Sequence, residues 1–243
     1  MFRSLAALML GFGFCAMADE PPRKYKSGDM TRPRPAVVTS GIAGAAPSDA
    51  IVLFDGKDFK EWKRSGKPKD GGDAAPWKIE TDYFEVVPRT SRIETRQSFG
   101  DAQIHIEWAT PAEVKGQGQG RGNSGVHLGG FGEIQVLDSF ENDTYPDGQA
   151  GALYSKFPPL VNASRKPGEW QTYDIIVHLP KVDASGKIVK LGLVTLLHNN
   201  VVVHHAAEFE KKIAPYTITL SDHGNPVRYR NIWVRKLKGY DEK

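Results

Sequence analysis

The sequence predicts an all-β fold, a two-sheet antiparallel β-sandwich of the jelly-roll type. Short runs in which apolar and polar residues alternate follow one another from about residue 51 to 237, and turns rich in Gly, Pro, Asn and Asp separate them. No segment keeps a helical period over ten or more residues. The 243-residue chain shows no internal repeat, and a chain of this length can bury one core as a single domain.

The expected strands follow from these runs. An apolar stretch at 51–54 opens the domain, and Asn199-Asn200 predicts a tight hairpin turn, because asparagine tolerates the positive φ angles that such turns need. Further strands are expected at residues 77–80, 83–87, 102–108, 125–128, 133–138, 170–179, 189–198, 201–205, 216–220 and 227–237. Many short strands at this spacing are typical of two packed sheets.

Residues 1–18 have the pattern of a secretory signal peptide. Arg3 supplies a positive start, residues 5–14 are apolar but too short to span a bilayer, and residues 16–18 (Ala-Met-Ala) form a small-x-small cleavage site. We therefore expect an exported protein, periplasmic or extracellular; a buried N-terminal helix or an uncleaved anchor is the alternative. Cleavage there also removes Cys15, the single cysteine, so the mature domain is expected to fold without a disulfide.

The rest of the chain divides into a linker, one domain and a short tail. Residues 19–49 are rich in Pro, Gly, Ala and basic residues, which predicts a flexible linker; a basic tether to an acidic surface is the alternative. The domain is expected at 50–238 and the tail at 239–243. The formal charge falls from +3 to +2 when Arg3 is removed, so a nucleic-acid partner has no electrostatic support. No apolar run after the signal peptide is long enough for a transmembrane helix.

Alternation places pairs of polar side chains on one face of several strands. The pairs are His105 with Glu107, Glu133 with Gln135, and Arg228 with Arg230. Polar residues on one face are also what any solvated sheet shows, so each pair taken singly has a purely structural alternative. Short acids, amides and imidazoles next to glycines favour a ligand-binding face.

A glycine-rich segment at 118–132 surrounds the strand expected at 125–128. Glycine permits close approach of backbone to a ligand, although such a loop could also be merely mobile. No Lys-Ser/Thr pair and no helix follow it, so a phosphate-binding loop is not indicated. Ser124 stands in Gly-Asn-Ser-Gly rather than in a Gly-x-Ser-x-Gly nucleophile elbow, and a serine hydrolase is not indicated either.

The histidines have different expected roles. Asp222 and His223 end one strand before a Gly-Asn-Pro turn, where they could form a base or metal ligand, or where Asp222 could simply cap backbone amides. His204 and His205 point to opposite faces of a strand and are expected to be structural. His198, next to the hairpin turn, is expected to be exposed.

Several motifs occur in the order found in one known family. They are LFDGKDFKEW, GNSGVHL, EIQVLDS, GALYSKFPPLVNASRKPGEWQTYDI, LHNN and LSDHGNPVRYRNIWVRKL. From about residue 50 to 238 the chain therefore resembles the 3-keto-disaccharide hydrolase domain family. The resemblance implies a concanavalin A-like jelly roll and an exported enzyme that cleaves glycosides whose sugar is oxidised at C3.

The implied chemistry has a clear physical basis. A ketone at C3 acidifies the proton on C2, and its removal gives an enolate that expels the group on C1; water can then add. This scheme needs a base near C2, a cation or hydrogen-bond donor at the C3 oxygen, and an acid for the leaving group. An ordinary glycosidase needs a pair of carboxylates instead.

On this resemblance we expect one sugar cleft on the concave sheet. Glu133 or His223 is expected to be the base, and Arg121 or Arg230 to stabilise the enolate. The expected catalytic residues are Glu133, His223, Glu107 and Arg230. The expected substrate-binding residues are Arg121, Asn123, His127, Gln135, Asp138, Tyr154, Asn162 and Asp222.

Three points stay open at this level. A divalent metal ion could polarise the ketone in place of an arginine, although the sequence has no compact set of metal ligands. The expected partners are a carbohydrate substrate and a C3-oxidising sugar dehydrogenase that acts beside this protein. A non-catalytic, lectin-like sugar-binding module is the alternative function, and a structural envelope domain is a further one, because a fold does not fix a function.

Overall fold

The computed structural model describes residues 24–42, 44–66, 71–211 and 215–240. The predicted signal peptide, residues 1–18, lies outside them. The chain divides into two compact units, residues 1–36 with 241–243, and residues 37–240. In the first unit, Asp29 Oδ1 accepts hydrogen bonds from the backbone and the hydroxyl of Thr31. All the strands belong to the second unit.

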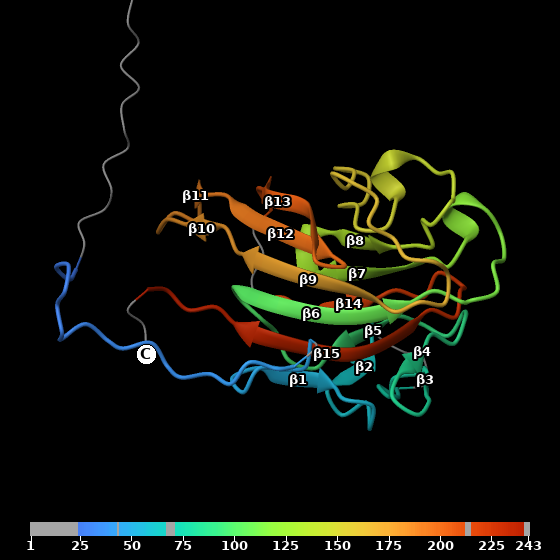
Figure 1. The fold of residues 1–243 in the computed structure, drawn as a ribbon, viewed down its shortest axis with the longest axis horizontal. Coiled ribbons are helices and arrows are strands. Elements are labelled where there is room, and N and C mark those ends of the chain that lie inside the picture. Colours follow the sequence, from blue (N-terminus) through green and yellow to red (C-terminus); the bar gives the residue numbers. More distant parts are fainter. Residues whose placement is uncertain (1–23, 43, 67–70, 212–214, 241–243) are drawn as a thin grey trace, which may run out of the picture. The chain divides into compact units, whose positions relative to one another are not determined.

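The described residues are almost entirely strands and loops (Figure 1). The strands are β1 (Ile51–Phe54), β2 (Trp62–Arg64), β3 (Lys78–Ile79), β4 (Phe84–Glu85), β5 (Ile93–Thr95), β6 (Ala102–Ala109), β7 (Ser124–Leu128), β8 (Glu133–Val136), β9 (Gln171–His178), β10 (Lys181–Val182), β11 (Ile188–Lys190), β12 (Gly192–His198), β13 (Val201–Phe209), β14 (Ile218–Leu220) and β15 (Arg228–Lys236). The helical elements are three 3₁₀ turns, η1 (Gly118–Gly120), η2 (Gly129–Phe131) and η3 (Pro146–Gly148).

Two antiparallel sheets form the sandwich. The large sheet has the strand order β13-β12-β9-β6-β15-β4-β3, and β1 also pairs with β15. The small sheet has the order β2-β5-β14-β7-β8, and β10 and β11 form a separate hairpin. The predicted all-β antiparallel sandwich is therefore confirmed.

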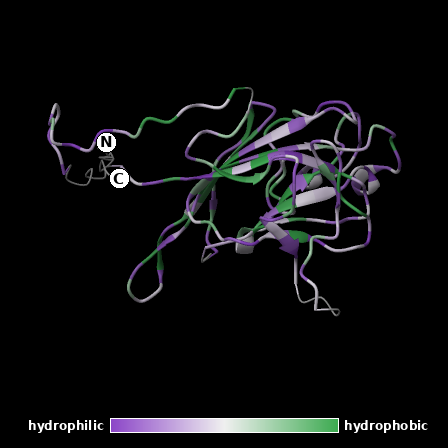
Figure 2. Cartoon of the chain, turned by 90° about the horizontal axis from the view of Figure 1, so that it is seen from below, coloured by the Kyte–Doolittle hydropathy of each residue, from purple (hydrophilic) through white to green (hydrophobic). Residues whose placement is uncertain are grey.

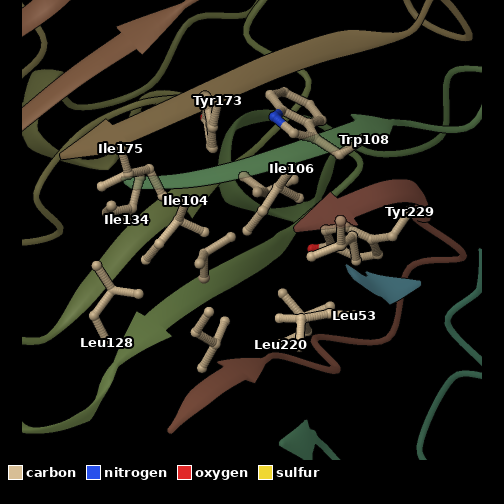
Figure 3. Packing of buried hydrophobic residues seen from close by; sticks show 14 of the residues in the cluster. Leu53, Ile104, Ile106, Trp108, Leu128, Ile134, Tyr173, Ile175, Leu220 and Tyr229 are labelled. Atoms are coloured by element: carbon tan, nitrogen blue, oxygen red, sulfur yellow. The ribbon is translucent and has the colours of Figure 1, made fainter. Parts of the chain in front are cut away.

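The core lies between the two sheets. Figure 3 shows apolar side chains from both sheets pointing toward one another, among them Ile104 and Ile106 of β6 and Leu128 of β7. Each fully buried side chain of this kind contributes about 1.5–3 kcal/mol. The hydroxyl of Tyr229, on β15, donates to Ser124 Oγ, on β7, at 2.6 Å and so joins the sheets by a buried hydrogen bond. Figure 2 shows apolar residues in the central strands and also in several loops.

Short strands are where the expectation and the structure differ. Strands β2, β5 and β10 were not expected, because each has only two or three residues and too few positions for a period of two to be visible. The run expected at 189–198 is divided between β11 and β12, which pair with different neighbours. In the described part of the chain, no helix has the length and apolarity needed to cross a membrane.

The hairpin between β12 and β13 has the expected turn and an unexpected histidine. Asn199 and Asn200 have φ angles of 52° and 67°, as predicted. The expectation that His198 is exposed is wrong: the residue is fully buried, it stacks on Trp108, and its Nε2 lies 2.8 Å from Gln171 Oε1. Burial lowers the pKa of His198 to about 3, so it is a neutral core residue.

The last part of the predicted linker, residues 37–49, makes specific contacts with the large sheet. Trp233 Nε1 donates to the carbonyl of Gly44 at 2.9 Å, and Arg235 Nε pairs with Asp49 Oδ2 at 2.7 Å. The compact unit therefore begins before the expected domain start at residue 50.

Candidate active site

The outer face of the small sheet carries the candidate site. Val126 and Ile134 point into the core, so their neighbours on β7 and β8 point outward. The register places His127 opposite Glu133. The expectation that Glu133 shares an outward sheet face with an imidazole is therefore met by the geometry.

Glu133 holds its carboxylate between two imidazoles, and we call Glu133, His127 and His223 the Glu133 cluster. Glu133 Oε1 lies 3.5 Å from His127 Nε2 and 3.3 Å from His223 Nε2. The side chain of Glu133 is 13% exposed, and those of the histidines are more accessible. His223 comes from the turn after β14, so three separate segments build the cluster.

Gly125 makes room for the Glu133 carboxylate. A Cβ at Gly125 would stand 1.7 Å from Glu133 Oε1, so a larger residue here would displace the carboxylate. Burial by itself raises the pKa of Glu133, but the hydrogen bonds and charges of His127 and His223 outweigh it and lower the pKa to about 2. Glu133 is thus ionised at every ordinary pH.

Ser221 completes the surroundings of His127 without forming a catalytic triad. Ser221 Oγ lies 2.7 Å from His127 Nε2, the same nitrogen that faces Glu133. A triad needs the serine and the acid on different ring nitrogens. Ser221 is also fully buried. The geometry therefore agrees with the absence of a serine-hydrolase motif.

Gln135 and Asn123 offer two carbonyl oxygens next to this cluster. Gln135 is 1% exposed, and its Nε2 donates to Gln119 Oε1 at 2.7 Å. Gln119 fixes this orientation because its own Nε2 donates to Thr144 Oγ1 and to the carbonyl of Gly148. The remaining oxygens, Oε1 of Gln135 and Oδ1 of Asn123, are buried and accept no hydrogen bond from the described residues.

A wall of loop residues covers the β8 side of this face; we define the wall as residues 117–120 and 142–154. Tyr145 and Tyr154 meet there through their hydroxyls. The charge of Glu133 is among the causes that raise the pKa of Tyr145 to about 12, after burial and the bond to Tyr154. Tyr145 is 44% exposed and keeps its proton at neutral pH. The predicted residue Tyr154 thus lies in the wall.

The wall also contains residues that the sequence did not single out. Tyr145 and Gln119 reach the site because loops fold back over the sheet, and no period in the sequence reports such a return. One local signal exists. A Cβ at Gly148 would stand 2.1 Å from the ring of Tyr145, so the Tyr-Pro-Asp-Gly turn needs its glycine to hold the ring in place.

The expectation that Glu107 and Arg230 share a cleft with Glu133 is wrong. Glu107 is on β6 and Arg230 is on β15, and their register neighbours Trp108 and Tyr229 point into the core. Both polar side chains therefore face outward from the large sheet, on the opposite side of the sandwich. Sequence alternation identifies an outward face but not the sheet to which that face belongs.

On the large sheet these residues form a second group, which we call the Glu107 cluster: Glu107, His105, Asp174, Arg230 and Asn231. Arg230 Nε donates to Glu107 Oε2 at 2.7 Å, and Asn231 Nδ2 donates to Glu107 Oε1 at 2.8 Å. His105 Nδ1 lies 2.7 Å from Asp174 Oδ1. The carboxylates of Glu107 and Asp174 thus each have a hydrogen-bond donor.

The members of the Glu107 cluster are covered to different extents: Glu107 is 12% exposed, Asp174 25% and Arg230 31%. The imidazole of the cluster, His105, is 4% exposed and stacks on Trp233, and Gly44 lies against its outer edge. Burial lowers the pKa of His105, but Asp174 and Glu107 outweigh this and raise it to about 9. Hydrogen bonds to Glu107 likewise overcome its burial and lower its pKa to about 2. A cavity of about 320 Å³ borders the cluster and is lined by Asp55, Asp82, Glu107, Arg230 and Asn231.

Arg121 and Asp138 form a structural clamp. Arg121 Nε donates to Asp138 Oδ2 at 2.6 Å, and its other nitrogens donate to the carbonyls of Phe140 and Glu141. Asp138 is 2% exposed and also accepts from the backbone of Phe140. The pair borders a cavity of about 250 Å³ next to Asn225. Arg121 is thus bound to the loop that follows β8 rather than directed at the Glu133 cluster.

Asp222 and Asn162 also bind backbone groups. Asp222 accepts hydrogen bonds from the amides of Thr90 and Gly224, so the capping alternative describes its geometry. Asn162 Nδ2 donates to the carbonyl of Ser139, and its Oδ1 accepts from the Ser164 amide. Both side chains are therefore engaged with backbone groups, and neither is part of the Glu133 cluster.

The donor set does not fit a metal ion. Among the described residues, no group of three or more His, Cys, Asp or Glu side chains is arranged to hold one. A divalent metal ion that polarises the ketone stays an alternative to an arginine, and chelation tests it.

Comparison with known proteins places this fold in a class. The sequence matches the family profile described as 3-keto-alpha-glucoside-1,2-lyase-like domain over residues 49–235. A protein from Parabacteroides distasonis ATCC 8503, provisionally named a glycosyl hydrolase, is 41% identical with a TM-score of 0.78; the match covers 86% of this chain and 95% of that one. A second such protein from the same organism is 19% identical with a TM-score of 0.57, over 78% and 94% of the two chains.

The sandwich is thus shared with proteins provisionally named glycosyl hydrolases. No curated protein matches the sequence significantly. The family match extends over nearly all of the two sheets, and the resemblance found in the sequence is confirmed. This chain belongs to the 3-keto-α-glucoside-1,2-lyase-like domain family.

Proposed function

We propose that the protein cleaves glycosides that carry a ketone at C3, by removing the C2 proton and eliminating the group on C1. The observation that carries this proposal is the Glu133 carboxylate between two imidazoles on an accessible sheet face. An ion of this kind can orient a neutral imidazole and stabilise its cationic form, which a base for a carbon acid needs.

His223 is the base in this proposal and Glu133 its partner. A carboxylate whose pKa is about 2 is a weak base, and histidine is the side chain that most often serves as a general base. His223 takes the proton from C2, and the C–H electron pair moves into the C2–C3 bond to form the enolate. Glu133 then faces the imidazolium at 3.3 Å.

The remaining roles follow from the order of groups across the face. Tyr145, at the wall, keeps its proton and donates a hydrogen bond to the C3 oxygen as the enolate forms. His127 lies on the other side of Glu133, and in its protonated form it gives a proton to the departing oxygen on C1. As the C1–O bond breaks, its electron pair goes to that oxygen, while the enolate pair forms the C1–C2 double bond and the C3 ketone is restored.

The carboxylate spacing along the outward row of the small sheet differs from that of ordinary glycosidases. In the outward row of the small sheet, the next described carboxylate after Glu133 is Glu94, three strands away. Strand spacing puts it at about 14 Å, whereas paired glycosidase carboxylates are about 5–9.5 Å apart.

The test is aglycone release by the purified protein from a chromogenic 3-keto-glucoside and from the unoxidised glucoside. Release from the keto form alone supports the proposal, and release from both overturns the elimination chemistry. Binding without release from either supports the lectin-like alternative. Loss of release after chelation, restored by a divalent metal, would add a metal to the scheme.

The proposal includes two features of the surroundings. Export through residues 1–18 would place the enzyme where it meets glycosides from outside the cell. A dehydrogenase that oxidises C3 would supply the substrate, since the chemistry requires the ketone beforehand.

A further inference from the structure

A row of polar side chains crosses all five strands of the small sheet. The register pairs Lys63 with Glu94, Glu94 with Thr219, Thr219 with His127, and His127 with Glu133. All five face outward, because their neighbours along each strand point into the core. Four steps of strand spacing give this row a length of about 19 Å.

The wall closes one end of the row. The backbone of residues 151–154 bonds along the free edge of β8, through Gly151 and Ala152 to Gln135 and through Tyr154 to Glu133. Gln135 faces outward and is nevertheless 1% exposed, so the wall covers the sheet at that end. A ligand longer than one sugar ring therefore cannot extend beyond β8.

The other end of the row is accessible. The side chains of Lys63 and Glu94 are 35% and 20% exposed, more than that of Glu133 at 13%. Lys63 Nζ lies 3.3 Å from Glu94 Oε1, and Ser65 Oγ donates to Glu94 Oε2 at 3.1 Å. The pair presents both a cation and an anion to a ligand, a combination that binds hydroxyl groups as donors and as acceptors.

We propose that this row is the floor of an extended cleft that runs across the strands, and that Lys63 and Glu94 bind the leaving group. The keto-sugar lies over His127 and Glu133, and a leaving group rich in hydroxyls lies over Thr219, Glu94 and Lys63. The proposal rests on the proposed function and adds to it the direction of the cleft and two specificity-determining residues. The preferred leaving group is thus a sugar or another polyol.

The structural alternative is an ordinary cross-strand ion pair. Opposite charges on adjacent strands stabilise many sheets without binding anything. The two explanations differ in kinetics, because a structural pair affects every substrate equally, whereas a leaving-group subsite affects only substrates long enough to reach it.

The experiment compares a 3-keto-disaccharide with a 3-keto-glucoside whose leaving group is 4-nitrophenol. The variants are Lys63→Ala and Glu94→Ala, and the matched control pair is Lys78→Ala and Glu80→Ala, an exposed ion pair at the end of the large sheet. We expect kcat/KM for the disaccharide to fall about ten- to a hundred-fold in the first two variants. The nitrophenyl substrate should change less than about two-fold, and the control pair should change neither.

The possible outcomes distinguish a failure of the proposed cleft from a failure of the proposed elimination chemistry. Equal effects on both substrates, or no effect on either, would overturn the cleft while leaving the elimination chemistry intact. If the wild type cleaves neither substrate, the proposed function fails. Calorimetry of 3-keto-disaccharide binding then tests the proposed cleft. Binding weakened in Glu94→Ala but not in Glu80→Ala would support it, and unchanged or absent binding would overturn it.

Discussion

Two clusters of imidazole and carboxylate groups lie on opposite outer faces of the sandwich, and they differ in how completely their charges are satisfied. In the Glu107 cluster, both oxygens of Glu107 accept hydrogen bonds, and His105 lies beneath Gly44 and against Trp233. In the Glu133 cluster, one carboxylate faces two imidazoles whose edges are more accessible.

The difference separates a charge network that holds a strand arrangement from one that can react. In the Glu107 cluster, ion pairs with Arg230 and His105 hold the carboxylates in place, and removing one member leaves another charge with fewer partners. In the Glu133 cluster, the histidine side chains are 21% and 34% exposed, and the wall covers one side. Composition alone does not distinguish the clusters, since both contain Glu and His.

The largest expected effect is on catalysis, in the matched pair Glu133→Gln and Glu107→Gln. We expect Glu133→Gln to lower kcat on a 3-keto-glucoside by about 10³-fold, because the imidazolium loses its counter-charge. The folded fraction of Glu107→Gln should keep kcat within about three-fold. Steady-state kinetics with active-protein correction checks both. The opposite ranking would move the active site to the large sheet, where the cavity of about 320 Å³ lies.

The next largest effect is on stability, and there the Glu107 cluster is expected to matter more than the Glu133 cluster. Glu107→Gln removes the nearer of the two carboxylates that pair with Arg230, at 2.7 Å, and leaves Asp82 at 3.1 Å. Because Glu107 is 12% exposed and Arg230 31% exposed, we expect a loss of about 1–2 kcal/mol in the free energy of unfolding. Denaturant unfolding measures it. The control Glu80→Gln, in an exposed pair, should change that free energy by less than about 0.5 kcal/mol. Equal losses in both variants would mean that the Glu107 cluster holds no special place in the fold.

A smaller effect sharpens the comparison from within the Glu133 cluster. Gly125→Ala puts a methyl group where the Glu133 carboxylate now lies, and moving a catalytic group by about 1 Å can cost about 10²-fold in rate. We expect kcat to fall about 10- to 100-fold with little loss of secondary structure by circular dichroism. Gly100→Ala is the control, because a Cβ there meets nothing within 4 Å. Wild-type turnover in Gly125→Ala would show that the carboxylate position is unimportant.

Sequence alternation predicted most of the sandwich and half of the site. The strands of four or more residues were expected because a period of two is visible over such lengths, and alternation placed Glu133 and Gln135 on one face. His127 was expected at the site only on the family resemblance. Strand β5, with three residues, carries Glu94 and was missed. The row across the small sheet could therefore not be foreseen.

The wrong predictions about the site have a common physical cause. Alternation tells which side of a strand is polar, but Glu107 and Glu133 look alike in that respect, and only the pairing of β6 with β9 and of β7 with β8 assigns them to different sheets. Arg121 offers a second case. Its cation suggested an enolate partner, yet in the fold it binds Asp138, a contact between loops that no local pattern reports.

The smallest expected effect is a pH dependence with opposite signs for the two clusters. The pKa of His105 is raised to about 9, so the stability it contributes is complete below pH 6.5, its ordinary value, and is lost as the pH rises through 9. The pKa of Glu133 is lowered to about 2, so its contribution is present above pH 4.5 and is lost as the pH falls toward 2.

Between pH 6.5 and 9.5 the pH dependence of the free energy of unfolding should therefore come mainly from the Glu107 cluster. We expect the free energy of unfolding of the wild type to fall by on the order of 2 kcal/mol over this window, measured by urea unfolding at several pH values. Asp174→Asn removes the carboxylate that faces His105 at 2.7 Å and should flatten the fall. His223→Asn should leave the fall unchanged, because His223 belongs to the other face. A fall that disappears in His223→Asn and persists in Asp174→Asn would exchange the roles of the two clusters.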